Sequence, residues 1–151
     1  MDVGCYCVSG SRLAAGREPV SLFGQAWFGE TGTDWVFTGS MRFADDLLAV
    51  FDCGTALPGR DELEVIGSEG SLFLDDPWHA QVPVIEVRRA DGVERIELDR
   101  VDSYRLELEN VSDAIEGNAE LLLGREDALG QARALEALHR SAESGEAVRL
   151  G

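Results

Sequence analysis

The segment DWVFTGSMRFADDLLAVFDC, residues 34–53, decides the fold class of this 151-residue chain. Its first half alternates with the period of two that is typical of a β-strand. The residues predicted to share one face are Trp35, Phe37, Gly39, Met41 and Phe43. The triplet ADD at 44–46 is a turn signal, and LLAVFDC at 47–53 predicts a further strand. We therefore expect neighbouring antiparallel strands in this region.

The flanking segments extend this pattern in both directions. Residues 2–15 predict a helix that ends at Gly16, and residues 20–28 predict a strand. Residues 61–77 predict a hairpin around a Gly-Ser-Glu-Gly turn, and residues 84–98 predict another around an Asp-Gly turn.

Beyond residue 102 the apolar spacing changes to a helical period of about 3.6 residues. The first predicted helix begins after a cap at Asp102 or Ser103 and ends at Gly117. The second spans about 125–144 and precedes a short strand at 147–150. The predicted apolar faces are Tyr104, Leu108, Val111 and Ile115 on the first helix and Ala128, Leu129, Ala132, Leu135, Leu138 and Ala142 on the second.

Segregated strands and helices predict an α+β fold, with a largely antiparallel open sheet and helices packed on one face. We expect residues 1–151 to form a single domain, since no linker or repeat interrupts them. The uncovered face of the sheet would carry Val36, Thr38 and Ser40, a mixed composition that suits self-association.

Charge and composition exclude several classes of function. The net charge of −16 disfavours binding to nucleic acid and to anionic membranes. All 13 basic residues are arginine, so no lysine chemistry is available. No apolar run approaches the roughly 20 residues of a membrane helix, and no signal peptide is recognisable, which predicts a cytoplasmic protein. Three cysteines, an odd number, indicate reduced thiols.

Most candidate sites have a simpler structural interpretation. Cys5 and Cys7 are two residues apart, which is too close for a zinc or redox motif, so no metal is expected and buried thiols are favoured. His79 follows Asp75 and Asp76 in a loop, where hydrogen bonding is more common than catalysis. His139 lies beside a predicted apolar stripe and is interpreted as structural. Neither nucleotide-binding glycine motif is present.

Asp2 and Tyr6 form a different kind of candidate. Their spacing of four places both side chains on one face of the predicted helix. A tyrosine can act as a general acid or base, but its ordinary pKa near 10 requires a neighbouring cation. The alternative is a Tyr6 packed in the core and an Asp2 that caps the helix.

Four segments resemble the Gfo/Idh/MocA oxidoreductases, in the branch of glucose–fructose oxidoreductase and dihydrodiol dehydrogenase. The N-terminal stretch MDVGCYCVSGSRL resembles the family's D-x-G-x-[HY] helix, with Tyr6 at the last position. The other segments are LEVIGSEGSLFLDDP, YRLELENVSDAIEG and EDALGQARALEALHRSAESGEAVRL. Only the family's C-terminal domain is resembled, so we expect the N-terminal dinucleotide-binding Rossmann domain, with its lysine, to be absent.

The resemblance implies an NAD(P)-dependent oxidation of a sugar, polyol or dihydrodiol hydroxyl. Tyr6 would then exchange a proton with the substrate, Asp2 would orient neighbouring groups, and Tyr104 is a weaker candidate for substrate contact. NAD or NADP would bind in the complete enzyme and not to this chain alone, which we expect to be inactive. The family also implies a dimer or tetramer through the open sheet face.

Two alternatives remain open at this point. The chain could be a non-catalytic, stand-alone dimerisation or binding module. More weakly, it could be a small lyase or isomerase that uses His79 with Asp75 or Asp76.

Overall fold

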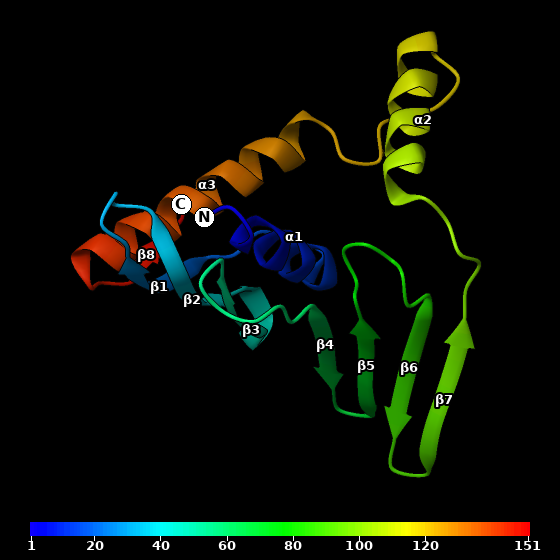
Figure 1. Cartoon of the computed structure of the whole chain (residues 1–151), viewed down its shortest axis with the longest axis horizontal. Coiled ribbons are helices and arrows are strands. Elements are labelled where there is room, and N and C mark those ends of the chain that lie inside the picture. The colour runs from blue at the N-terminus through cyan, green and yellow to red at the C-terminus, as the bar shows by residue number, and fades with distance from the viewer. The chain divides into compact units, whose positions relative to one another are not determined.

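The computed structural model describes residues 1–151 and contains two compact units (Figure 1). The first unit comprises Met1–Pro58 and Leu123–Gly151, and the second comprises Gly59–Leu122. The α+β class with antiparallel strands is confirmed. The strands form two four-stranded sheets, however, rather than the one sheet expected. No helix combines the length and the apolar character needed to cross a membrane.

The first unit is an antiparallel sheet with helices on one face, and its strand order is β3-β2-β1-β8. The strands are β1 (Ser21–Phe28), β2 (Asp34–Arg42), β3 (Leu48–Gly54) and β8 (Val148–Arg149). The covering helices are α1 (Gly4–Ala15) and α3 (Arg125–Ser144), and a short turn, η1 (Ala44–Asp46), joins β2 to β3. Helix α1 ends as predicted at Gly16, whose φ of 62° is left-handed and suits glycine.

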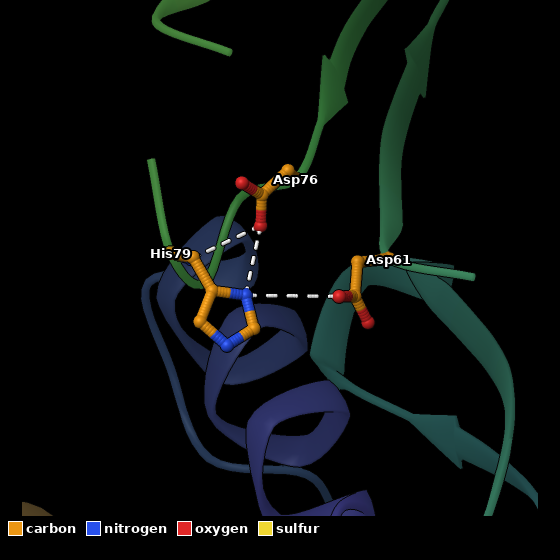
Figure 2. A group of neighbouring side chains, drawn as sticks. All are labelled: Asp61, Asp76 and His79. Atoms are coloured by element: carbon orange, nitrogen blue, oxygen red, sulfur yellow. Dashed lines mark hydrogen bonds and ion pairs between the residues drawn. The ribbon is translucent and has the colours of Figure 1, made fainter. Parts of the chain in front are cut away.

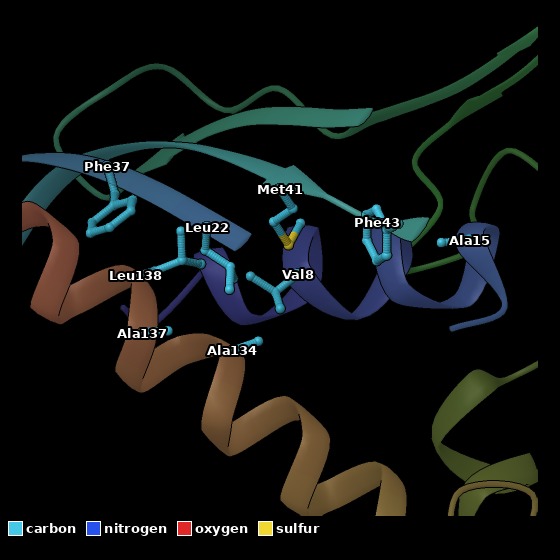
Figure 3. Packing of buried hydrophobic residues seen from close by; sticks show 9 residues of the cluster. All are labelled: Val8, Ala15, Leu22, Phe37, Met41, Phe43, Ala134, Ala137 and Leu138. Atoms are coloured by element: carbon cyan, nitrogen blue, oxygen red, sulfur yellow. The ribbon is translucent and has the colours of Figure 1, made fainter. Parts of the chain in front are cut away.

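The core of this unit lies between the sheet and its two helices (Figure 3). Phe37 and Met41 of β2 and Phe43, directly after it, point inward and are each only 1% exposed, which confirms the predicted inward face. They meet Val8 of α1 and Leu138 of α3, which are fully buried. Burial of each such large side chain contributes about 1.5–3 kcal/mol. Trp35 differs from the prediction, because it is 37% exposed.

Helix α3 buries a narrower and smaller set of side chains than its sequence pattern predicts. Its buried residues are Gly130, Ala134, Ala137, Leu138 and Ser141. Ala128 and Ala132, predicted to be buried, are exposed, as is Leu129. Mainly small residues form the buried face of α3, because the helix approaches the sheet closely. A β-carbon built on Gly24 of β1 would lie only 2.8 Å from the carbonyl oxygen of Leu138.

A buried hydrogen bond fixes α3 on the edge of β1. Strand β8 pairs with β1 only at Ser21 and Leu22, so the backbone of β1 is unpaired on that side beyond this point. There the N–H of Gly24 donates to Oγ of Ser141, at 3.0 Å. The bond satisfies a backbone donor that would otherwise be buried without a partner.

The second unit is a meander with strand order β4-β5-β6-β7, followed by one helix. The strands are β4 (Glu62–Gly67), β5 (Gly70–Asp75), β6 (Val84–Arg89) and β7 (Gly92–Glu97), and the helix is α2 (Ser103–Glu116). Both predicted hairpins are confirmed. Asp102 caps α2, because its Oδ1 accepts from the backbone N–H groups of Tyr104 and Arg105. No residue of α2 is buried, so its predicted apolar face stays exposed.

Candidate functional site

Tyr6 lies in the first turn of α1 and is 48% exposed. The interpretation of Tyr6 as a core residue is therefore wrong. The helix faces the sheet through Val8, which is fully buried, and Tyr6 lies off that buried stripe. A half-exposed phenol on a packed helix can exchange a proton with a bound ligand.

Asp2 precedes the helix instead of belonging to it. The N-cap position of α1 is Val3, which makes no side-chain capping bond, so the expected capping role of Asp2 is wrong. The backbone oxygen of Asp2 accepts a hydrogen bond from the Cys5 thiol, at 2.9 Å. Asp2 thus lies just before the helix that carries Tyr6, and both residues are exposed.

The position of α1 depends on Arg12, an arginine that is only 6% exposed. Its Nε and Nη2 donate to the two carboxylate oxygens of Glu18, at 2.9 and 2.6 Å. Nη2 also lies 3.0 Å from Oδ1 of Asp127, and Nη1 donates to Oε1 of Gln131. The guanidinium therefore holds α1 to the chain leading into β1 and to α3 together.

Gln131 makes a second connection between the same helices. Its amide nitrogen donates to the backbone oxygen of Cys5, at 2.8 Å, while its amide oxygen accepts from Arg12. Cys5 is adjacent to Tyr6 in sequence. Through this pair of bonds α3 fixes the turn of α1 that carries the tyrosine.

Charge pairing also shifts the pKa values of Glu18 and Arg12. The hydrogen bond from Arg12 is the largest cause that lowers the pKa of Glu18, and the Coulomb attraction of Arg12 adds to it. The Glu18 carboxylate raises the pKa of Arg12 in turn, mainly through the same bond. The pair stays ionised at neutral pH.

The remaining tyrosine and the histidine of α3 have separate surroundings. Tyr104 is 66% exposed on α2, so the expectation that it packs in a core is wrong; its contact with substrate stays a prediction. His139 packs edge-on against Phe37, with ring centroids 5.7 Å apart, which agrees with a structural interpretation.

The His79 loop contains a cluster of three polar side chains, shown in Figure 2. His79 Nδ1 lies 3.0 Å from Oδ1 of Asp76 and 3.7 Å from Oδ2 of Asp61. The structure thus brings His79 to Asp76, as one alternative requires, with Asp61 as the second carboxylate. Asp61 was not predicted, yet the hairpin register contains the signal: Glu62 pairs with Asp75, which places Asp61 beside Asp76.

The Asp76 carboxylate organises this loop. Its Oδ2 accepts from the backbone N–H of Gln81, at 2.9 Å, and its Oδ1 accepts from the backbone N–H of His79, at 3.2 Å. The Gln81 bond is the largest cause that lowers the pKa of Asp76. Side-chain atoms of Asp61, Asp76 and His79 lie within 4.8 Å of one another and have the donor types of a cation site. Two of these three residues are exposed, and Asp76 is already engaged by the backbone.

Comparison with curated proteins gives relatives that align with nearly all of this chain. D-xylose 1-dehydrogenase (NADP(+)) 2 of Haloferax volcanii is 29% identical, over 99% of this chain and 47% of the relative. Uncharacterized oxidoreductase ORF334 of Rhizobium meliloti is 27% identical, over 95% of this chain and 46% of the relative. The chain thus spans about half the length of the curated relatives it matches.

The family model described as the GFO/IDH/MocA C-terminal domain matches residues 1–73, the segment that contains α1 and Tyr6. This match covers just under half of the 151 residues and makes the N-terminal part of the chain similar to the GFO/IDH/MocA C-terminal domain. The fold agrees over a longer range. The crystal structure of aldose-aldose oxidoreductase from Caulobacter crescentus superposes with a TM-score of 0.89 over 99% of this chain and 47% of that one, at 20% identity.

The Arg12 network gives a prediction about stability. Arg12→Met keeps the apolar stem but removes the charged group that joins α1 to Glu18 and Asp127. We expect a loss of about 2–4 kcal/mol in the free energy of unfolding, measured by urea denaturation at pH 7. The matched control is Arg17→Met, since Arg17 pairs with an exposed Asp45 and its loss should cost under about 1 kcal/mol.

The difference in the free energy of unfolding between the wild type and Arg12→Met should also depend on pH. Because the folded-state pKa of Glu18 is lowered, its stabilisation is present above the ordinary glutamate pKa of about 4.3. It is lost as the pH falls through the folded value. The difference between wild type and Arg12→Met should therefore shrink in acid, and a difference that grows in acid, or equal losses in both variants at pH 7, would contradict the assigned role of Arg12.

Proposed function

We propose that this chain is the substrate-binding and oligomerisation half of an NAD(P)-dependent oxidoreductase that acts on a hydroxyl of a sugar, polyol or dihydrodiol. The observation that carries the proposal is the half-exposed Tyr6 on a firmly held α1, inside the segment that matches the GFO/IDH/MocA C-terminal domain. The D-xylose dehydrogenase of Haloferax volcanii supports the substrate class and the cofactor.

The proposed chemistry in this chain is proton transfer at the phenol oxygen of Tyr6. The phenol accepts the proton of a substrate hydroxyl during oxidation and returns it to a carbonyl during reduction. A phenol needs a nearby cation for this task at neutral pH, and the chain contains no lysine to supply one. We assign that cation to the complementary half of the enzyme. Asp2 orients groups near Tyr6, and Tyr104 contacts the substrate.

The nucleotide does not fit the elements of this chain. A dinucleotide site uses a parallel βαβ unit with a glycine-rich turn at the start of its helix, whereas both sheets here are antiparallel throughout. When bound, NAD(P) supplies the hydride acceptor.

The open face of the first sheet is the proposed surface for a dimer or tetramer. The face opposite α1 and α3 includes Val36, Thr38 and Ser40, as predicted, and Ser40 pairs with Phe23 on one side and Val50 on the other. Val50 is 81% exposed and Leu48 68% exposed. Adjacent apolar side chains on an open sheet face favour association with a second copy of the same face.

A non-catalytic binding module is the second candidate. The absence of lysine and of a nucleotide-binding motif favours it for the isolated chain. The coding sequence upstream of Met1 distinguishes the two: an in-frame dinucleotide-binding half supports the oxidoreductase, and a stop codon with a genuine start site supports the module. A cytoplasmic location stays a prediction under either proposal.

The first test uses the purified chain by itself. We expect no oxidation of D-xylose with NAD or NADP and no tight nucleotide binding in titration calorimetry, because the nucleotide site lies in the other half. Titration with D-xylose, followed by amide chemical shifts, should perturb α1 around Tyr6. Tetrahydropyran is the control, since it has the ring without the hydroxyls.

Two results would overturn this assignment in different ways. Turnover by the chain alone would show that the active site is complete without a second half. Shifts confined to the loop around His79, or absent at saturating sugar, would remove the substrate-binding role and leave the module.

The second test concerns the open sheet face. Val50→Glu places a charge on the edge strand β3 of this face and should convert the oligomer to a monomer in sedimentation velocity. Val93→Glu is the matched control, since Val93 is 60% exposed on β7 of the other unit and should leave the mass unchanged. A wild-type chain that sediments as a monomer would refute the proposed surface.

A further inference from the structure

Two of the three cysteines come together between α1 and β3. A β-carbon built on Gly4 would lie 2.8 Å from the Sγ of Cys53, so the Cys53 sulfur rests against the first turn of α1. Cys7 is three residues beyond Gly4, on the same face of the helix. The Sγ of Cys7 lies 4.0 Å from the backbone oxygen of Asp52, next to Cys53.

The two thiols also influence each other electrostatically. Cys7 is the largest cause that raises the pKa of Cys53, which agrees with the closeness of the two side chains, and both residues are partly buried. The expectation of buried thiols is wrong for Cys5 and Cys7, because both are half-buried. Cys5 points elsewhere, because its thiol donates to the backbone oxygen of Asp2.

We propose that Cys7 and Cys53 form an oxidation site, a dithiol that a peroxide converts to an intramolecular disulfide between α1 and β3. Nothing in this inference depends on the proposed oxidoreductase function. Its consequence is local: the new bond would attach the turn of α1 next to Tyr6 covalently to the sheet.

The chemistry balances with hydrogen peroxide as the oxidant. The Cys7 thiolate attacks the peroxide, an S–O bond forms, the O–O bond breaks, and the leaving hydroxide takes up a proton to become water. The Cys53 sulfur, after losing its proton, attacks the Cys7 sulfur and displaces the oxygen as a second water. Two thiols lose two electrons, and one peroxide gains them.

The surroundings of Cys53 assign the order of these steps. The neighbouring Cys7 side chain, burial, and the nearby carboxylates of Asp34 and Asp52 together raise the pKa of Cys53 above that of an ordinary thiol. Cys53 is thus the poorer nucleophile toward peroxide, because the thiolate is the reactive form. Cys7 reacts first, and Cys53 resolves the intermediate.

The test treats the reduced, purified chain with hydrogen peroxide, blocks the remaining thiols with N-ethylmaleimide, and maps the peptides without reduction. In the wild type we expect a Cys7–Cys53 linked peptide, with Cys5 alone still alkylated. Cys5→Ser is the matched control and should form the same link. Cys7→Ser and Cys53→Ser should each form no intramolecular disulfide, and dithiothreitol should restore all three thiols of the wild type.

The wild-type peptide map alone decides the question if a variant fails to fold. A disulfide that includes Cys5, or a sulfinic acid on Cys7 while Cys53 remains fully alkylated, would overturn the proposal. So would three thiols that stay alkylated after the peroxide treatment.

Discussion

The buried guanidinium of Arg12 is the interaction on which the first unit depends. It is 6% exposed and donates at once to Glu18, Gln131 and the backbone of Asp127. A buried charge is tolerated only when its hydrogen-bonding positions are filled, and here α1, α3 and the chain before β1 fill them together. The same contacts keep Tyr6 on the half-exposed side of α1, so the fold and the candidate site share one constraint.

Strand and helix boundaries were largely predictable from the sequence, because alternation, glycine turns and caps are local signals. The hairpin at residues 61–77 and the cap at Asp102 are confirmed for this reason. The buried stripe of α3 was not predictable, since it depends on the close approach of α3 to Gly24 of β1 at Leu138, which lies far away in the sequence. The division into two sheets is likewise set by which strands pair, and local patterns do not contain that information.

In the candidate site, too, local features were predictable from the sequence and long-range contacts were not. The exposed position of Tyr6 contradicts the core interpretation that the residue pattern alone favoured, while the family match covers the segment that contains it. The partners that matter were distant in sequence: Arg12 with Asp127, and Cys7 with Cys53. Arginine within a predicted helix gives no sign of burial until the packing of a second helix is known.

Steady-state kinetics of Tyr6→Phe test the proposed role of Tyr6 most directly, measured in the oxidoreductase that we propose, in which this chain works with a dinucleotide-binding half. Removal of the phenol oxygen should lower kcat by about 10²–10⁴-fold and leave KM for the sugar within a few-fold, because proton transfer is lost while the ring remains. Tyr104→Phe should retain most of kcat. A Tyr6→Phe enzyme that keeps the wild-type kcat would contradict the assignment of Tyr6 as the acid–base residue.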